Sequence, residues 1–159
     1  MSVNVAHLGL GIDSPLVTPT VSNYRPPSWP PPKDFPIVID GHGHVISRYG
    51  DSSWRFWPWA RKPLTLAFGD GPHRAGTSRN TLVNADLLRQ VVAWWMYGPQ
   101  PVREPGALMT RFYTLRAMFV LCSREGIAAS DLMRFPHVAD KVHMSMPASQ
   151  AELGLRLLH

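Results

Sequence analysis

The stretch PGALMTRFYTLRAMFVLCSREG, residues 105–126, decides the predicted fold class, because it carries the clearest helix pattern in the chain. Proline suits the first turn of a helix and glycine suits the left-handed position that ends one, so Pro105 and Gly126 mark the two ends. Apolar residues recur between them at spacings of four and three, which places them on one helix face: Leu108, Phe112, Leu115, Phe119 and Cys122. The stretch therefore predicts a long helix with one buried face.

Helical patterns lie on both sides of this stretch. Upstream, the apolar residues of NADLLRQVVAWWMYG, residues 84–98, also recur at threes and fours. Downstream, Ser130 can cap a short helix over DLMRF, and Pro136 can open another over PHVADKVHMSM. A last helix is expected over AELGLRLLH, where Ser149 and Glu152 form a capping box. Because that helix stops in mid-pattern, we expect a truncated C-terminus, or a catalytic domain or partner protein that packs on this helix.

The first half of the chain differs in composition. Eight of the 16 prolines precede residue 37, and runs such as PPSWPPP cannot form a helix, because proline lacks the backbone donor. After them come strand-like segments: IVI, HVISRY, WRFWPW and LTLAF, with a turn at DGHG. The sequence thus predicts a proline-rich extended arm over 1–36, a β-rich leader and linker over 37–78, and a helical domain over 79–159. The predicted fold is mainly α, a bundle of about four to five helices preceded by a short β-hairpin-like leader and the extended arm.

Charge and cysteine content limit the classes of function. The formal net charge is +5, from 16 Lys and Arg against 11 Asp and Glu, and most of the basic residues are Arg. Such a balance favours an anionic partner, a nucleic acid or a lipid surface. Cys122 is the single cysteine, so neither an internal disulfide nor a cysteine zinc site can form. With no signal-peptide pattern and no apolar run of roughly 18 residues, we expect a cytoplasmic protein that does not enter the membrane.

Arginines in and beside the first two helices are the candidate phosphate contacts. The guanidinium group is planar and binds two phosphate oxygens at once. The alternative is a solvated helix face. The candidates are Arg79, Arg89, Arg103, Arg111, Arg116 and Arg124. Aromatic side chains of WRFWPW and of Trp94 and Trp95 could stack on bases, but filling a core is the preferred interpretation.

The segment DGHGH suggests a second chemistry. Asp40, His42 and His44 alternate, so in a strand they share one face, and the segment resembles the metal-binding first strand of the amidohydrolase family. That resemblance implies a metal-dependent hydrolase fragment. The family's barrel needs roughly 250 residues, whereas 115 follow His44 and read as helices. Asp-Gly is also a strong hairpin-turn dipeptide, so a turn is the preferred interpretation.

Two patterns run through the leader and the helices. In the helical region Leu115, Phe119 and Leu121 are followed by SREGI and SDLMRFP. The leader DGHGHVISRYGDSSWRFWPW has the form D-x-x-G-x-V-x-S-x-Y-G-D-x-x-W, matched by Asp40, Gly43, Val45, Ser47, Tyr49, Gly50, Asp51 and Trp54. Together they resemble the N-terminal, core-binding half of tyrosine recombinases, the phage-integrase-like enzymes, in a divergent bacterial branch whose leader has this form.

The resemblance implies a function in DNA recombination and integration on a mobile element. It implies binding of double-stranded DNA by a bundle of about four helices. The family's catalytic Arg, Lys, His-x-x-Arg and nucleophilic Tyr would lie in a domain after this chain, so no catalytic residue and no cofactor is expected and the chain should not act as an enzyme alone. A protein-interaction module, using the proline-rich arm as an SH3-type ligand or the last helix, is a further alternative.

Overall fold

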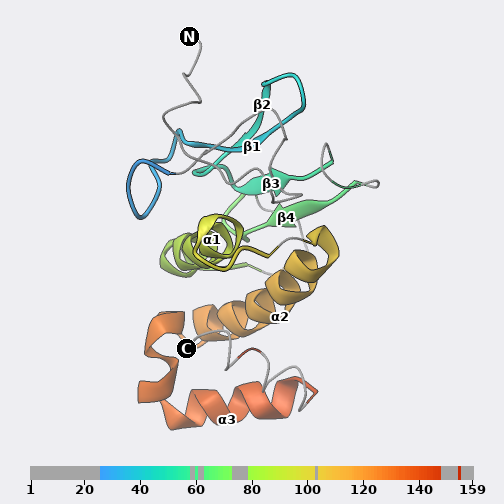
Figure 1. The fold of residues 1–159 in the computed structure, drawn as a ribbon. Helices are drawn as coiled ribbons and strands as arrows, with labels where there is room; N and C mark the ends of the chain where they lie inside the picture. The colour runs from blue at the N-terminus through green and yellow to red at the C-terminus, as the bar shows by residue number, and fades with distance from the viewer. Residues whose placement is uncertain are drawn as a thin grey trace. The chain divides into compact units, whose positions relative to one another are not determined.

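The computed structural model describes residues 26–57, 60, 63–72, 79–102, 104–147 and 154 (Figure 1). Apart from Gly154, the expected helix over AELGLRLLH lies outside these residues, as do its capping box and most of the proline-rich arm. The strands are β1 (Pro36–Ile39), β2 (Val45–Arg48), β3 (Ser53–Arg55) and β4 (Thr65–Ala67). The helices are α1 (Leu82–Tyr97), α2 (Pro105–Arg124), the 3-10 helix η2 (Ala129–Arg134) and α3 (Pro136–Ser145). Within the described residues no helix is long and apolar enough to cross a bilayer.

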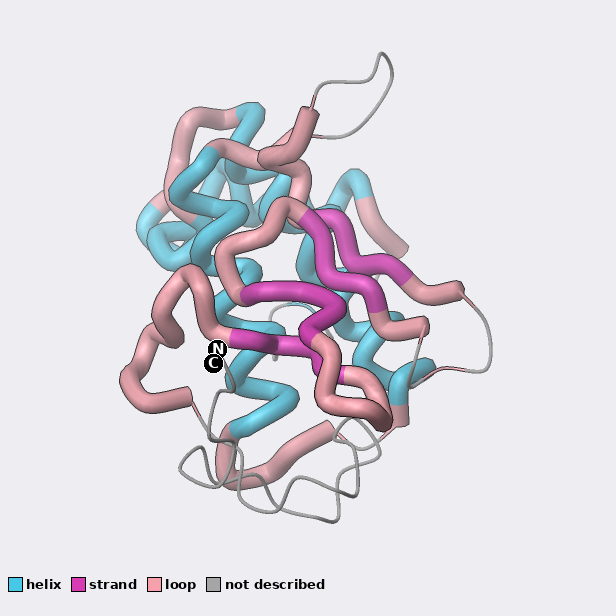
Figure 2. The backbone as a smooth tube through the Cα atoms, turned by 90° about the horizontal axis from the view of Figure 1, so that it is seen from above, coloured by secondary structure: helices cyan, strands magenta, loops and turns pink. Residues whose placement is uncertain are grey.

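The prediction of a mainly α bundle is wrong, because the strands form sheets with a core of their own. β1 pairs with β2 and β3 pairs with β4, giving two antiparallel sheets of two strands each (Figure 2). Their inward side chains are as fully buried as those of the helices: Ile37, Val38, Trp54 and Leu66 have no exposed surface. The region expected to be a leader is therefore part of the folded structure, and the fold of the described residues is mixed α/β.

The described chain separates into two compact units, each assembled from two stretches of sequence. One unit combines Met1–Ala67 with Gln90–Leu108, and the other combines Phe68–Arg89 with Met109–His159. The strands and the second half of α1 belong to the first unit. The first half of α1, most of α2, η2 and α3 belong to the second. The three-part division expected from composition stays a prediction.

The β1–β2 hairpin of the first unit is closed by Asp40. One carboxylate oxygen of Asp40 accepts hydrogen bonds from the backbone N–H groups of His42 and His44, each at 2.8 Å. The backbone N–H of Asp40 donates to the carbonyl of His44 at 2.9 Å, and Gly43 takes a positive φ of 81°. The predicted turn is confirmed. Its aspartate and glycine supply the hydrogen-bond acceptor and the backbone conformation that a tight turn needs.

Aromatic residues form the core of the same unit. Trp54 and Phe56 have no exposed surface, which confirms the preferred interpretation for them, whereas 54% of Trp57 is exposed. The indole N–H of Trp54 donates to the carbonyl of Tyr49 at 3.2 Å. The hydroxyl of Tyr97, at the end of α1, donates to the carbonyl of Ile37 at 2.6 Å, and burial raises the pKa of Tyr97. The phenol therefore stays protonated and links α1 to β1.

α2 begins and ends where its sequence predicts. Pro105 is its first residue, and beyond its last turn Gly126 takes a φ of 72°. The N–H of Ile127 donates to the carbonyl of Cys122 at 3.0 Å, and the N–H of Gly126 donates to that of Ser123 at 3.1 Å. These two bonds form a Schellman motif, which satisfies the last carbonyls of the helix. The predicted stripe is also buried: Leu108, Phe112, Leu115, Phe119 and Cys122 are at most 1% exposed.

The start of η2 depends on a residue far away in sequence. The predicted cap Ser130 is wrong: the N-cap position is Ala128, which has no side-chain cap. Instead the N–H of Ala129 donates to the side-chain oxygen of Asn84, 45 positions upstream, at 2.8 Å. The amide nitrogen of Asn84 donates to Ser123 and to the carbonyl of Ile127, at 2.9 and 3.0 Å. Asn84 is fully buried, and these bonds satisfy both ends of its amide.

Candidate nucleic-acid interface

The ionisable side chains of α2 are all basic apart from one tyrosine and one cysteine. Its 20 residues include three arginines, Arg111, Arg116 and Arg124, and no acidic residue. Arg124 stands in the last turn and is exposed, where a cation also interacts favourably with the helix dipole. Glu125, the next residue, is paired at 2.6 Å with Lys141 of α3, so its carboxylate already has a cation. The residues of α2 itself therefore carry three positive charges and no negative one.

A cavity of about 360 Å³ opens on one face of α2, beside the C-terminal end of α3. In Figure 1, α3 lies below α2 within this unit, at an angle to it. The polar residues that line the cavity are Tyr113, Arg116 and Arg124 of α2 and Ser145 of α3. Ala117, Val120 and Met146 contribute apolar wall, and none of the described residues that line it is acidic. The volume lies in the usual range of small-ligand sites, which is about 300–1,000 Å³.

Arg116 has a hydrogen-bond donor with no acceptor. Its Nε atom is buried, and it has no hydrogen-bond partner among the described residues. Leaving a buried N–H unsatisfied costs about 1–3 kcal/mol, so such groups are rare in folded proteins. Arg116 also lines the cavity, so its side chain adds positive charge where a bound anion would lie. The cavity therefore combines an apolar wall with cationic donors, the combination that recognises an anion.

Arg89, a candidate from the sequence, is placed very differently. Only 2% of its side chain is exposed, and its guanidinium is bound to both carboxylate oxygens of Asp70, at 2.7 and 2.6 Å. A third bond reaches Asp86 at 2.9 Å, and the guanidinium lies 4.9 Å from the ring centre of Phe68. This bidentate, buried arrangement ties α1 to the segment before it. Its charge is compensated, so we leave Arg89 out of the interface.

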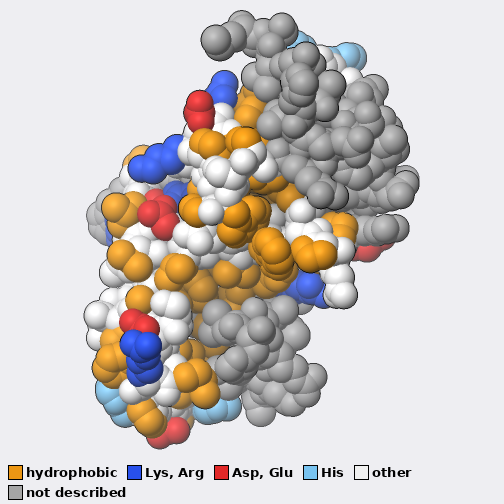
Figure 3. Space-filling model, turned by 60° about the vertical axis from the view of Figure 1, so that its left-hand side comes forward, with side chains coloured by type: hydrophobic (Ala, Val, Ile, Leu, Met, Phe, Trp, Pro, Cys, Tyr) orange, Lys and Arg blue, Asp and Glu red, His pale blue; other side chains and the backbone are white. Residues whose placement is uncertain are grey.

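The other candidate arginines are not among the described residues that line this cavity. Arg79 is exposed just before α1, Arg111 is half-buried in α2, and Arg103 lies outside the described residues. Figure 3 shows Lys and Arg side chains at scattered places on the face in view, several of them next to Asp or Glu side chains. Of the candidates that the structure describes, Arg116 and Arg124 lie at a common cavity. The spacing of residues along α2 could not predict the cavity, because part of its lining comes from a distant segment: Ser145, the last residue of α3, and Met146, which follows it.

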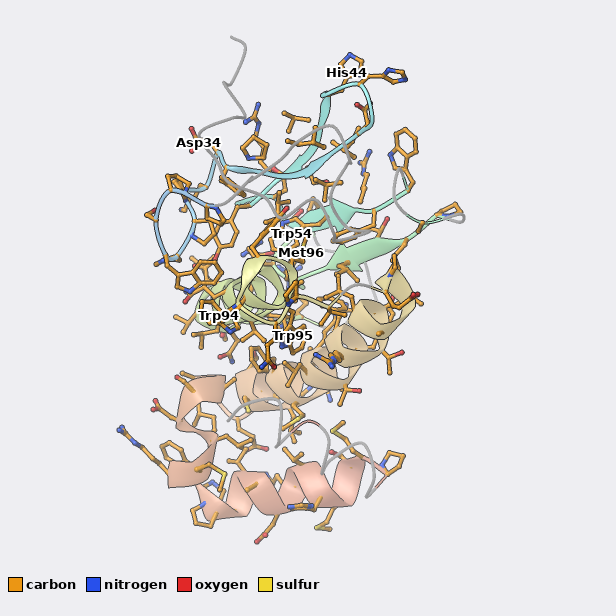
Figure 4. All side chains as sticks on the ribbon, viewed as in Figure 1. Asp34, His44, Trp54, Trp94, Trp95 and Met96 are labelled. Atoms are coloured by element: carbon orange, nitrogen blue, oxygen red, sulfur yellow. The ribbon has the colours of Figure 1, made fainter. Side chains whose placement is uncertain are left out.

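The histidine segment is arranged as a turn. His44 lies at the tip of the hairpin and projects away from the strands, with 74% of its side chain exposed (Figure 4). Its Nδ1 is 3.0 Å from the second carboxylate oxygen of Asp40, and the His42 and His44 ring centres are 6.1 Å apart. In the part of the chain that the structure describes, no three His, Cys, Asp or Glu side chains converge as a metal site.

The electrostatics of Asp40 reflect its role in that turn. Partial burial acts to raise its pKa, but the backbone N–H groups of His44 and His42 and the His44 side chain outweigh this effect and lower it. Asp40 therefore stays ionised, and its acceptor oxygens are used by its own hairpin.

Cys122 is not placed as a nucleophile. It is fully buried on the apolar stripe of α2, and burial raises the pKa of its thiol to about 11. A reactive cysteine needs the opposite shift and access to solvent.

Comparison with known proteins gives no relative: no protein-family model, curated protein or solved structure matches this chain.

Proposed function

We propose that this protein binds double-stranded DNA through phosphate contacts from α2, in a non-catalytic role, as the N-terminal part of a tyrosine-recombinase-like protein. The observation that carries the proposal is the charge of α2, which has three arginines and no acidic residue. Among the described residues, Arg116 and Arg124 line a cavity that no acidic side chain lines, and the buried Nε of Arg116 has no hydrogen-bond partner. Such side chains position a protein on DNA without reading its sequence.

The mechanism is electrostatic. Each arginine that neutralises a phosphate releases condensed counterions, so the logarithm of affinity falls with the logarithm of salt concentration by about 0.9 per contact. The overall charge of +5 adds an attraction that increases the association rate at low salt. The resemblance to recombinases supports double-stranded DNA as the partner. In such a protein this part would hold one face of the duplex while a catalytic domain held the other.

Fluorescence anisotropy with a labelled random duplex of about 30 base pairs, titrated at low and moderate salt, tests the proposal. We expect a dissociation constant of about 1 µM or tighter at low salt, weakening several-fold as salt is added. The Arg111→Ala, Arg116→Ala double variant should bind more weakly and with a smaller salt slope.

Arg134→Ala is the matched control, because Arg134 is exposed, lies outside α2 and pairs with Asp131 at 3.6 Å. Absence of binding at low salt would remove the proposed function. An unchanged salt slope in the double variant would remove α2 as the contact.

A further inference from the structure

We propose that the cavity on α2 binds one phosphate group of the DNA backbone, with Arg116 as the residue that holds it. This inference rests on the proposed function and assigns a specific site within it. Arg116 lines the cavity, its buried Nε has no hydrogen-bond partner among the described residues, and the cavity is large enough for a phosphate and its sugar. A phosphate oxygen is the acceptor that the planar guanidinium fits best.

Charge at the cavity favours one anion. The two lining guanidiniums of Arg116 and Arg124 contribute two positive charges. Their α-carbons are eight residues apart, which is about 12 Å along a helix, a distance that two long side chains can share. The C-terminal ends of α2 and α3 oppose an anion, but each is worth only about half a negative charge. For the described groups the sum is about one positive charge, which matches a single phosphodiester.

The remaining lining distinguishes a DNA phosphate from a free ion. Ala117, Val120 and Met146 give an apolar wall, which suits the carbon atoms of a deoxyribose and offers nothing to inorganic phosphate. Tyr113, 48% exposed at the edge, has a hydroxyl that can donate to a second oxygen. The hydroxyl of Ser145 donates to the carbonyl of Val142 at 3.3 Å and is therefore already used. The expected ligand is thus a phosphate ester with its sugar against the wall.

Filling the cavity while keeping both arginines tests the assignment. Ala117 is exposed and lines the cavity, so Ala117→Phe should block it without changing the charge. Ala107→Phe is the matched control, because Ala107 is exposed in the first turn of α2 and does not line the cavity. We expect Ala117→Phe to lose one phosphate contact: a salt slope smaller by about 0.9 and an affinity about 5- to 10-fold weaker near 0.1 M salt. Ala107→Phe should bind like the unmodified chain.

A second variant keeps the charge and removes the planar fork. Arg116→Lys lacks the planar guanidinium that binds two phosphate oxygens at once, so it should bind DNA several-fold more weakly, with Arg134→Lys unchanged. Melting followed by circular dichroism confirms that each variant is folded.

Equal affinities for Ala117→Phe and Ala107→Phe would overturn the cavity assignment while leaving DNA binding intact. Absence of binding by the unmodified chain would instead overturn the proposed function itself. If inorganic phosphate at matched ionic strength displaced DNA from the unmodified chain and not from Ala117→Phe, the cavity would be a site for the free ion, and its assignment to DNA would be wrong.

Discussion

Arg89 and Arg116 are two arginines in helices of the same unit, and the structure gives them opposite surroundings. Arg89 has two carboxylates and an aromatic ring around it, so its charge and its donors are compensated. Arg116 has no carboxylate partner among the described residues, and its Nε donor is buried without an acceptor. The sequence offers both as phosphate contacts. Burial alone does not distinguish the two arginines, because both are partly or fully buried. They differ in whether their buried N–H groups have hydrogen-bond acceptors among the described residues.

The difference teaches how to read a buried arginine. A buried guanidinium with all donors satisfied is part of the fold, since removing it leaves an unpaired carboxylate. A guanidinium with an unsatisfied donor in a cavity already carries the desolvation cost that a ligand would relieve. Function is therefore expected where hydrogen bonding is incomplete, and stability where it is complete. The following predictions test that distinction, from the largest expected effect to the smallest.

Arg89→Met should give the largest effect, a loss of unfolding free energy of about 3–5 kcal/mol. The reason is that Asp70, whose side chain is only 13% exposed, keeps its charge and loses its partner. Urea denaturation followed by circular dichroism measures it. A loss below about 1 kcal/mol would mean that Arg89 is as weakly held as a surface ion pair, and the comparison would fail.

The thiol of Cys122 makes the free energy of unfolding depend on pH, with an expected effect smaller than that of Arg89→Met. Its pKa of about 11 in the folded state lies above the ordinary 9.0, so the folded protein keeps the proton while the unfolded chain loses it. Stability from this group is complete below pH 9 and is lost as pH rises to 11, by an amount on the order of 2 kcal/mol. Cys122→Ala should show a smaller alkaline decline in urea denaturation at pH 8 and pH 10.5.

Thiol labelling then ranks the arginine variants. At neutral pH a thiol reagent should modify the unmodified chain only through unfolding, because Cys122 is fully buried. Labelling should accelerate strongly in Arg89→Met and stay unchanged in Arg116→Met. Fast labelling of the unmodified chain would show that this face of α2 opens readily. The difference between Arg89 and Arg116 could then not be explained by their burial.

Arg116→Met should change stability little, between no effect and a gain of about 1 kcal/mol, because the lost N–H made no hydrogen bond. In the same variant DNA affinity should fall and its salt slope should drop by about 1. Parallel urea denaturation and anisotropy separate the two readouts. A stability loss approaching that of Arg89→Met would place Arg116 among the structural arginines.

The hairpin tip should give the smallest effect. Replacing both His42 and His44 by alanine should leave folding and DNA affinity unchanged, since their side chains are exposed at a turn held by Asp40. Asp40→Ala should weaken the hairpin, and its stabilising effect should be lost in acid as pH falls through the lowered pKa of Asp40. Melting curves with and without Zn²⁺ complete the test. A zinc-dependent rise in melting temperature that disappears in the double alanine variant would favour the metal interpretation.

Local features of this fold could be predicted from the sequence. The ends of α2, its buried stripe and the turn at Gly43 each depend on residues a few positions apart, so propensity and spacing suffice. The burial of Trp54 and Phe56 also agrees with the preferred interpretation of the aromatic residues as core.

Features set by distant residues could not be predicted. The strands between Pro36 and Ala67 were recognised, but their short runs do not reveal that they build a core, and so the fold class was wrong. Asp70, which binds the guanidinium of Arg89 through both carboxylate oxygens, lies 19 positions upstream and could not be identified from local spacing. Asp86, three positions before Arg89, was the partner that spacing could indicate. The cavity beside Arg116 needs the end of α3, which no local pattern relates to α2.

The bond from Asn84 to Ala129 has a consequence for the order of folding. A helix capped by its own neighbour can form early, because no long loop has to close. The first N–H of η2, that of Ala129, instead donates to the side chain of Asn84 in α1, 45 positions away. This hydrogen bond can form only after the chain between the two residues has closed into a loop. Amide hydrogen exchange at Ala129 should therefore become slow in the same kinetic step as exchange in the first turns of α1, later than in the middle of α2.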